Sequence, residues 1–195
     1  MTDFTTRYLL LAAQITKLIQ VESIEETIDV LAEVKSQAGR VFILGVGGSA
    51  ANSSHAVNDF RKLAEIEAYS PTDNVSEITA RTNDHGWKNV FAPWLKISKL
   101  SNRDCIFILS VGGGDKDRNL SENLCEAVDY AKFVGAKIVG IVGRNGGYTA
   151  KFANPLIIIP TVSDEFVTQF TESFQQIIWH LMVSHPKLKT NPTTW

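Results

Sequence analysis

Residues 41–51 read Val-Phe-Ile-Leu-Gly-Val-Gly-Gly-Ser-Ala-Ala, and this stretch decides the fold that we expect. The four apolar residues, two of them β-branched, predict a short buried strand, and the glycines allow a sharp turn into a helix. The unpaired amides at such a helix start favour an anion, and Gly47 and Gly48 carry no side chain that would exclude one. Ser49 adds a hydroxyl that can cap the helix or bind the same anion. The stretch therefore predicts a strand, a loop and a helix that together offer a phosphate site.

Three further apolar runs predict buried strands, at residues 105–110, 137–142 and 155–160. Between and after the four strands, apolar spacing predicts helices at residues 50–64, from an Asn119 cap to Gly135, and at residues 164–183. Residues 75–80 suggest a further short helix that runs into a polar turn at residues 82–86. Apolar strands that alternate with helices are typical of a parallel sheet covered on both faces. We therefore expect an α/β protein, a three-layer αβα sandwich with a central parallel sheet. Ligands of such sheets bind beyond the strand carboxyl ends, which here are the glycine-rich turns after Leu44 and Ser110.

Two helices are expected before the first strand. Apolar residues at alternating spacings of four and three predict the first helix, and a capping box at residues 23–26 predicts the start of the second. The first helix has a broad apolar face, which favours packing against both its own domain and another subunit. That face consists of Phe4, Tyr8, Leu9, Leu10, Leu11, Ile15, Leu18 and Ile19. We expect one domain over residues 1–195, with an N-terminal helical hairpin for oligomerisation at 1–39 and an α/β core at 40–195.

The composition limits the possible partners. The chain has 195 residues, of which 44% are hydrophobic, and this suits a single globular domain. Its net charge of -2 offers no basic excess for nucleic acid or an anionic membrane, and no apolar stretch approaches the roughly 18 residues of a membrane span. Cys105 and Cys125 lack a CxxC spacing and fall in apolar patterns, which predicts reduced, buried thiols. We expect a soluble, cytoplasmic protein with no nucleic-acid or membrane partner.

Polar side chains recur at helical spacing in two of the predicted helices. His55 and Asp59 are four residues apart and therefore lie one above the other on a single helix face. Glu172, Gln176 and His180 form a similar ladder on the last helix. Both patterns suit a solvated helix face as well as a functional site, so the residues alone leave both interpretations open.

These motifs resemble the sugar isomerase (SIS) domain family, and most of all its phosphoheptose isomerase branch. The resemblance covers nearly the whole chain. Its matching segments are residues 45–51 with His55, residues 79–80 and 83–86, the strand at 106–110, residues 140–147, and His180. The resemblance implies an SIS, flavodoxin-like fold and a homotetramer whose N-terminal helices pack into its core.

The resemblance also implies a reaction, the conversion of sedoheptulose 7-phosphate to D-glycero-D-manno-heptose 7-phosphate through an enediol. Asp59 and His180 match the base and acid of the branch. Some members hold zinc, and the matching positions are His55, Asp59, Glu172 and His180. The expected substrate-binding residues are Gly47, Gly48, Ser49, Asn83, Asp84, Ser110, Gly112, Gly113, Asp115 and Glu172. The phosphate would be held mainly by the second loop, with Ser49 lending a hydroxyl.

Two departures from the branch leave an alternative open. Residues 110–115 read Ser-Val-Gly-Gly-Gly-Asp where the branch has a phosphate loop rich in Ser and Thr, so most hydroxyl donors are missing. Glycine amides can still bind an anion, and Lys116 and Arg118 can neutralise Asp115 or contact the phosphate. Asp59 is also one methylene shorter than the Glu of the branch. The alternative is a non-catalytic SIS module that binds a sugar phosphate or a protein partner as a regulator.

A dinucleotide-binding fold is a third interpretation. Gly45, Gly47 and Ala50 fit the pattern GxGxxA, and Glu65 or Glu67 follows roughly 20 residues later. That fold requires a second strand directly after the helix. The apolar residues at 66–69 are interrupted by charge, so the sequence argues against this strand and against this fold.

Overall fold

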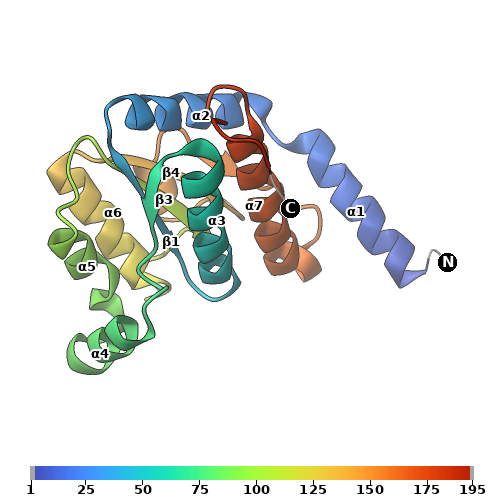
Figure 1. Cartoon of the computed structure of the whole chain (residues 1–195). Coiled ribbons are helices and arrows are strands. Elements are labelled where there is room, and N and C mark those ends of the chain that lie inside the picture. Colours follow the sequence, from blue (N-terminus) through green and yellow to red (C-terminus); the bar gives the residue numbers. More distant parts are fainter. Residues whose placement is uncertain (1–2, 194–195) are drawn as a thin grey trace.

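The computed structural model describes residues 3–193 and has a five-stranded sheet at its centre (Figure 1). Its strands are β1 (Arg40–Gly45), β2 (Glu67–Tyr69), β3 (Cys105–Ser110), β4 (Lys137–Val142) and β5 (Ile157–Ile158). All neighbours pair in parallel, in the order β2-β1-β3-β4-β5. This is the strand order of flavodoxin-like folds, so the predicted fold class is confirmed.

Helices cover both faces of the sheet and create two apolar layers. One layer holds α2 (Val21–Ser36), α3 (Gly48–Ala64) and α7 (Val167–Ser184), and the other holds α5 (Phe91–Ile97) and α6 (Glu122–Val134). Because successive side chains of a strand point to opposite faces, Ile43 of β1 packs in the first layer and Phe42 in the second. The central strands are thus buried on both sides, which explains why they read as continuous apolar runs.

The edge strands differ from the sequence prediction. β2 was not expected, because charges interrupt its apolar residues, yet it pairs with β1 through three residues. As an edge strand it buries only Ala68, while Glu67 is exposed, so its charge is tolerated. The argument against a second strand was therefore wrong. At the other edge, β5 is confined to Ile157–Ile158 and is shorter than the predicted run of residues 155–160.

Three helix boundaries also differ. α2 begins at Val21, before the predicted capping box. α4 (Val75–His85) includes the residues that were expected to form a polar turn after a shorter helix. α6 begins at Glu122 rather than at an Asn119 cap, because Asp115 and Leu120 exchange two backbone hydrogen bonds of 2.9 Å and close a small loop. Asn119 and Ser121 have φ values of 54° and 49° there, which a helix does not allow.

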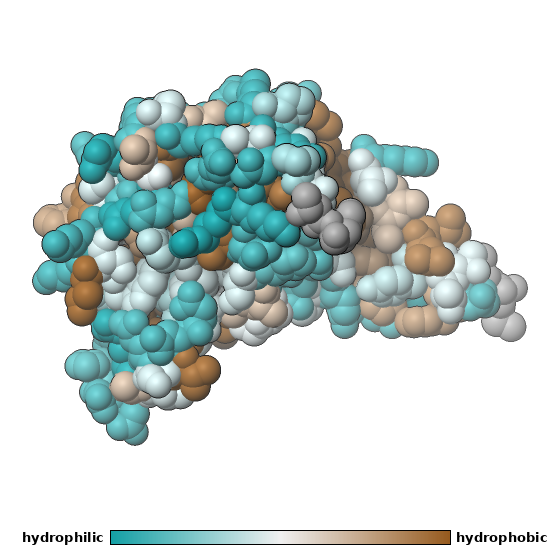
Figure 2. Space-filling view, viewed as in Figure 1, coloured by the Kyte–Doolittle hydropathy of each residue, from teal (hydrophilic) through white to brown (hydrophobic). Residues whose placement is uncertain are grey.

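The N-terminal helices diverge instead of lying side by side. α1 (Phe4–Leu18) projects from the body, whereas α2 packs on the sheet (Figure 1). Tyr8 anchors α1 to α7, with its ring 4.6 Å from that of Phe170. Within α1 only Ile15 is buried, and the space-filling view shows apolar residues exposed along this arm (Figure 2). The exposed large apolar residues of α1 are Phe4, Leu9, Leu10 and Leu18.

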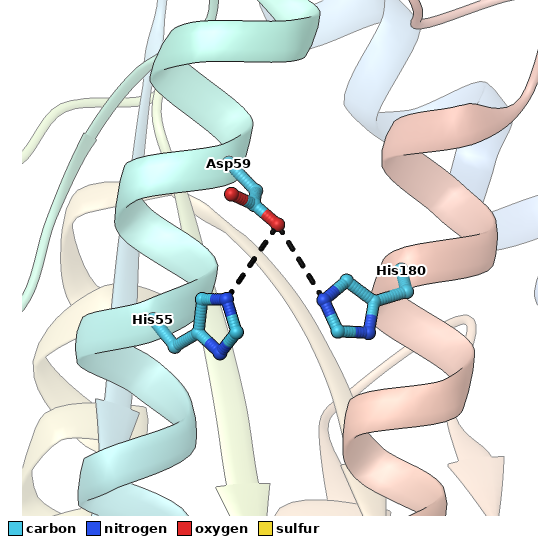
Figure 3. A group of neighbouring side chains, drawn as sticks. All are labelled: His55, Asp59 and His180. Carbon is cyan, nitrogen blue, oxygen red and sulfur yellow. Dashed lines mark ion pairs between the residues drawn. The ribbon is translucent and has the colours of Figure 1, made fainter. Parts of the chain in front are cut away.

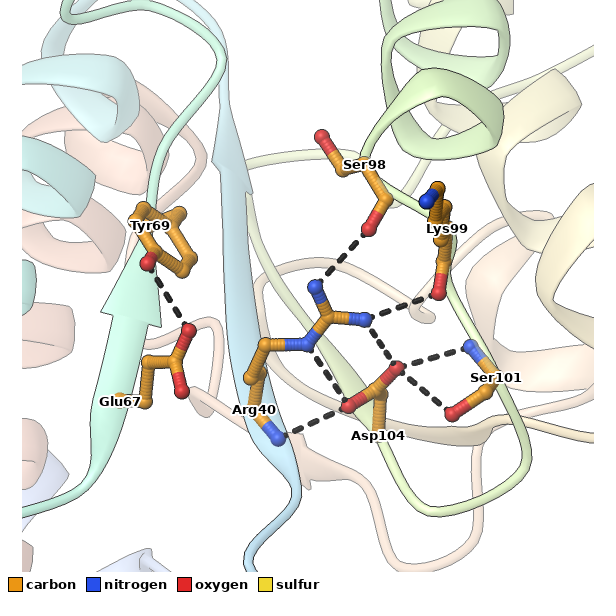
Figure 4. A network of polar contacts seen from close by, with 7 residues as sticks. All are labelled: Arg40, Glu67, Tyr69, Ser98, Lys99, Ser101 and Asp104. Atoms are coloured by element: carbon orange, nitrogen blue, oxygen red, sulfur yellow. Dashed lines mark hydrogen bonds and ion pairs between the residues drawn. The ribbon is translucent and has the colours of Figure 1, made fainter.

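A polar network ties the start of β1 to the turn before β3 (Figure 4). The buried Asp104 carboxylate accepts hydrogen bonds from the backbone amide, Nε and Nη2 of Arg40, and from the amide and hydroxyl of Ser101. Arg40 also donates to the carbonyls of Ser98 and Lys99. Burial alone would raise the pKa of Asp104, but the hydrogen bonds from Arg40 and Ser101 outweigh it and hold this pKa below its ordinary value. Asp104 is therefore charged at neutral pH.

Two other expectations can be compared with the structure. Cys105 and Cys125 are buried free thiols, as predicted, and burial raises the pKa of Cys105 to about 12. Among residues 3–193, no helix combines the length and the apolar character that crossing a bilayer requires.

Candidate active site

His55 and Asp59 of α3 come together with His180 of α7 (Figure 3). Nε2 of His55 lies 3.8 Å from Oδ2 of Asp59, and Nε2 of His180 lies 3.5 Å from the same oxygen. The spacing of four residues places the two α3 side chains on one helix face. The packing of α7 beside α3 places His180 next to them. The two imidazoles are about half exposed, while the side chain of Asp59 is only 14% exposed. The group thus combines a nearly buried carboxylate with two imidazoles that solvent or a ligand can reach.

Trp179 packs against this three-residue group. Its fully buried ring lies 3.7 Å from the His180 ring and 4.7 Å from the His55 ring, measured between centroids. Burial lowers the pKa of His180; Asp59 opposes this effect and His55 adds to it. The neutral imidazole, which can both accept and donate a proton, is therefore favoured near neutral pH. Sequence reasoning missed Trp179, because an aromatic residue at a core position of a helix carries no functional signal.

The three side chains could also hold a metal ion. One ligand atom from each lies within 4.8 Å of the others. Two imidazoles and one carboxylate are a ligand set that catalytic zinc sites use, with a further position left for water or substrate. The donor chemistry of this group therefore fits zinc.

Glu172 lies apart from this group, although it was expected among the zinc ligands. It precedes His180 by two helical turns on α7, and its carboxylate lies over the start of α3. A Cβ on Gly48 would come within 2.4 Å of its Oε2 atom. The unpaired amides and the positive dipole end of α3 stabilise a carboxylate at this position.

The first glycine loop holds α3 close to β1. A Cβ on Gly45 would lie 2.3 Å from the carbonyl oxygen of Ser49, so the close approach requires glycine. Gly47 has a φ of 63° and occupies the position before the helix. Ser49 does not cap the helix. It is buried, and its hydroxyl has no hydrogen-bond partner within residues 3–193.

The second glycine loop, which follows β3, is partly hydrogen-bonded to the segment that follows β4. The amide of Gly113 donates to the hydroxyl of Ser110, and its carbonyl accepts from the amide and hydroxyl of Thr149. The space over Gly112 is open. Asp115 Oδ1 accepts from the amides of residues 117 and 118. The loop therefore offers an anion fewer free groups than its glycine content suggests.

The cations beside this loop have separate partners. Arg118 Nε lies 3.6 Å from Oδ2 of Asp115, so this arginine partly neutralises the carboxylate, as the sequence suggested. Lys116 instead pairs with Asp129 and lies 3.5 Å from Glu126. Lys116 is therefore drawn toward α6 and away from Asp115.

Asn83 and Asp84 lie on the last turn of α4, which extends from the body away from α7 (Figure 1). Both are exposed, and the amide of Asn83 donates to the carboxylate of Asp84 over 2.9 Å. Within the described chain, Asp84 is not part of the group formed by His55, Asp59 and His180. The structure thus brings together three of the expected site residues and distributes the others over both glycine loops, α4 and the first half of α7.

The fold and the three-residue group define an α/β protein with two histidines and an aspartate gathered on the helices beside its sheet. A family model described as "SIS domain" matches residues 4–143. The chain belongs to the SIS domain family.

Relatives place the chain in the phosphoheptose isomerase branch of this family. The phosphoheptose isomerase of Syntrophotalea carbinolica is 30% identical over 168 residues, which are 83% of this chain and 80% of that protein. The phosphoheptose isomerase of Helicobacter pylori strain P12 is 28% identical over 146 residues, or 72% of each chain. The lincomycin biosynthesis protein LmbN of Streptomyces lincolnensis is 31% identical over 158 residues, which are 75% of this chain and 56% of LmbN.

Solved structures share the fold. Phosphoheptose isomerase GmhA from Neisseria gonorrhoeae has a TM-score of 0.77 at 24% identity, with 89% of this chain and 90% of that chain covered. A phosphoheptose isomerase from Francisella tularensis has a TM-score of 0.78 at 20% identity, with 94% and 97% covered. Both likenesses extend over nearly the whole length of each chain.

Proposed function

We propose that this protein is an aldose-ketose isomerase that converts sedoheptulose 7-phosphate to D-glycero-D-manno-heptose 7-phosphate. The observation that carries the proposal is the carboxylate of Asp59 between the imidazoles of His55 and His180. The relatives named phosphoheptose isomerase support it and favour an enzyme over a non-catalytic module.

The reaction moves one proton between adjacent carbons of the open-chain sugar. In the proposed mechanism, Asp59 accepts the proton from the hydroxyl-bearing carbon next to the carbonyl, which leaves an enediol, and the same carboxyl group returns a proton to the neighbouring carbon. His180 moves the second proton, from the hydroxyl oxygen to the former carbonyl oxygen. Its lowered pKa supports this role, because a neutral imidazole can accept one proton and donate another.

We further propose that His55, Asp59 and His180 can hold zinc. When bound, the ion would polarise the carbonyl and hydroxyl oxygens of the sugar. Glu172 was expected as the fourth ligand and would have to turn away from Gly48 to reach the ion. Three protein ligands already suffice for a catalytic zinc site, so Glu172 is not needed in this proposal.

The phosphate end of the substrate would lie near the glycine loops. Ser49 in the first turn of α3 would contribute a hydrogen bond only if its buried hydroxyl turned outward. The open space over Gly112 supports a contribution from the second loop, together with Ser110, Gly113 and Asp115. The Glu172 carboxylate lies over Gly48 and would repel a phosphate there, which favours the second loop.

We propose that the protein acts as a homotetramer in the cytoplasm. The exposed apolar arm of α1 supports an oligomer, because such a surface is costly to leave in water. Ile177 and Leu181 are also exposed on α7 beside His180, so a neighbouring copy could cover them and border the active site. Asn83 and Asp84 could reach a site in this way, from the α4 of another copy.

A turnover assay tests the function. NMR should show conversion of sedoheptulose 7-phosphate by the full chain, with metal analysis of the purified protein and assays with and without added zinc. Asp59→Asn and His180→Ala should each lower kcat/KM by at least about 100-fold while circular dichroism shows a retained fold.

His185→Ala is the matched control, because this histidine lies at the end of α7 outside the three-residue group. It should retain turnover. No conversion of any ketose phosphate, with or without zinc, would contradict the proposal.

A further inference from the structure

Trp179 of α7 forms a buried wall behind the two imidazoles of the three-residue group. Its side chain is fully buried, whereas the side chains of His55 and His180 are 49% and 41% exposed. The indole ring meets the His180 ring at an interplanar angle of 47° and the His55 ring at 72°. The two imidazoles are 5.3 Å apart between centroids and nearly perpendicular to each other. One indole ring thus contacts an imidazole from each of two helices.

The contacts of the imidazoles with Asp59 do not fix their orientation. Figure 3 shows both Nε2 atoms directed at one carboxylate oxygen, over 3.8 Å for His55 and 3.5 Å for His180. These distances are longer than those of ordinary hydrogen bonds, so each ring is held only loosely by the carboxylate. A half-exposed side chain that is loosely held can turn into other rotamers. Packing against Trp179 is therefore the contact that limits this rotation.

A separate polar bridge holds the backbones of the two helices in register. The amide nitrogen of Asn52 on α3 donates to the carbonyl of Glu172 over 2.9 Å and to Oε1 of Gln175 over 3.1 Å, both on α7. The buried Gln175 in turn donates to the carbonyl of Ile141 on β4 over 3.3 Å. This bridge joins α3, α7 and the sheet without involving Trp179. A substitution at Trp179 should therefore change the imidazoles more than the helices that carry them.

We propose that Trp179 is a positioning residue whose indole ring holds the imidazoles of His55 and His180 in the orientation that directs both Nε2 atoms at Asp59. Aromatic rings in contact prefer tilted or edge-to-face arrangements, and both observed contacts are of this kind. Because catalytic groups act from a narrow range of positions, such a wall favours the chemical step more than substrate affinity. This kinetic consequence rests on the proposed isomerase function, whereas the orientation of the two rings does not.

Nuclear Overhauser spectroscopy on the full chain tests the orientation without substrate. The wild type should show cross-peaks between the ring protons of His55 and His180, because the two rings are close neighbours. Trp179→Leu removes the aromatic wall and should lose these cross-peaks. Trp179→Met is a second non-aromatic variant with a more flexible side chain, should the leucine variant not fold. Trp179→Phe keeps an aromatic face and should retain the cross-peaks, and within residues 3–193 the indole Nε1 has no hydrogen bond to lose.

Steady-state kinetics with sedoheptulose 7-phosphate separate positioning from stability. Trp179→Leu should lower kcat at least about tenfold and change KM by less than about twofold, and Trp179→Phe should recover most of the lost kcat. Phe91→Leu is the matched control, because Phe91 is an equally buried aromatic residue in the apolar layer on the opposite face of the sheet. It should lower stability as well, but keep both the cross-peaks and kcat.

The outcomes for orientation and for turnover can be told apart. The proposal is overturned if the cross-peaks are absent from the wild type, persist in the non-aromatic variants or disappear in Phe91→Leu. It is also overturned if, in an active protein, Trp179→Leu has the kcat of the wild type or Trp179→Phe is as slow as Trp179→Leu. Cross-peaks that behave as expected in a protein that converts no ketose phosphate would contradict the proposed function and support the positioning of both imidazoles by Trp179.

Discussion

One carboxylate oxygen of Asp59 lies between two imidazoles, 3.8 Å from Nε2 of His55 and 3.5 Å from Nε2 of His180. The spacing of His55 and Asp59 predicted half of this arrangement, because residues four apart share a helix face. The approach of His180 depends on how α7 packs beside α3, and only the family resemblance suggested it. The same resemblance grouped Glu172 with these residues, whereas its side chain lies at the start of α3. Helical spacing could not reveal which way that side chain turns.

At the residue scale, a Ser49→Ala substitution tests whether this hydroxyl contributes to ligand binding or to the stability of the fold. Its buried hydroxyl has no partner within the described residues, so Ser49→Ala should change the free energy of unfolding by less than about 0.5 kcal/mol. If this hydroxyl binds the substrate phosphate, KM for sedoheptulose 7-phosphate should rise about tenfold. Urea unfolding and steady-state kinetics measure the two effects.

Ser53→Ala is the matched control. Ser53 is equally buried, but its hydroxyl donates to the Ser49 carbonyl over 2.8 Å. Its loss should cost about 1 kcal/mol of stability and leave KM unchanged. A destabilised Ser49→Ala protein with an unchanged KM would show that this hydroxyl serves the fold alone.

At the scale of elements, the central strands were predictable and the edges were not. β1, β3 and β4 are buried on both faces, and continuous apolar runs identify such strands directly. β2 exposes charged Glu67 at the sheet edge, so its pairing depends on the neighbouring strand more than on its own pattern. α6 starts late because residues 115–120 form a closed loop, and the apolar spacing of the sequence does not predict such a loop.

The network around Asp104, which ties β1 to β3, predicts how the free energy of unfolding depends on pH. Asp104→Asn leaves Arg40 without its charged partner and should cost about 2 to 4 kcal/mol at pH 7. Because the pKa of Asp104 is lowered by folding, its carboxylate contributes stability above the ordinary pKa of 3.8, and this contribution is lost as the pH falls below that value. The difference in the free energy of unfolding between the wild type and Asp104→Asn should therefore become smaller below about pH 4.

Urea unfolding at pH 7 and at pH 3 measures this difference. Asp164→Asn, which changes an exposed aspartate at the start of a short helical turn, should have little effect at either pH. A difference for Asp104→Asn that stays constant with pH would contradict the assigned charge state.

At the scale of the whole molecule, the exposed apolar arm of α1 is the surface that the proposed oligomer would cover. The sequence predicted a broad apolar face on this helix, and the structure leaves Leu9 and Leu10 at least 60% exposed. Sequence periodicity identified the face but could not show that α1 would leave the body instead of folding back on α2. That outcome depends on which surfaces α2 already buries against the sheet.

Charge on this arm should break the proposed tetramer. Leu9→Glu combined with Leu10→Glu should convert a tetramer to smaller species, as measured by light scattering after size-exclusion chromatography, because buried carboxylates are costly to desolvate. Phe133→Glu alters an even more exposed apolar residue, on α6, and should remain tetrameric. A monomeric wild type, or dissociation caused by Phe133→Glu alone, would contradict the proposed assembly.

The proposed proton transfer at the three-residue group can be tested directly. The wild-type protein should convert sedoheptulose 7-phosphate in D2O to an aldose phosphate that carries deuterium at C2, detected by NMR, because the base carries the proton and solvent reaches both imidazoles. Asp59→Asn should give neither product nor exchange. Turnover and exchange by Asp59→Asn equal to those of the wild type would contradict the assignment of Asp59 as the base.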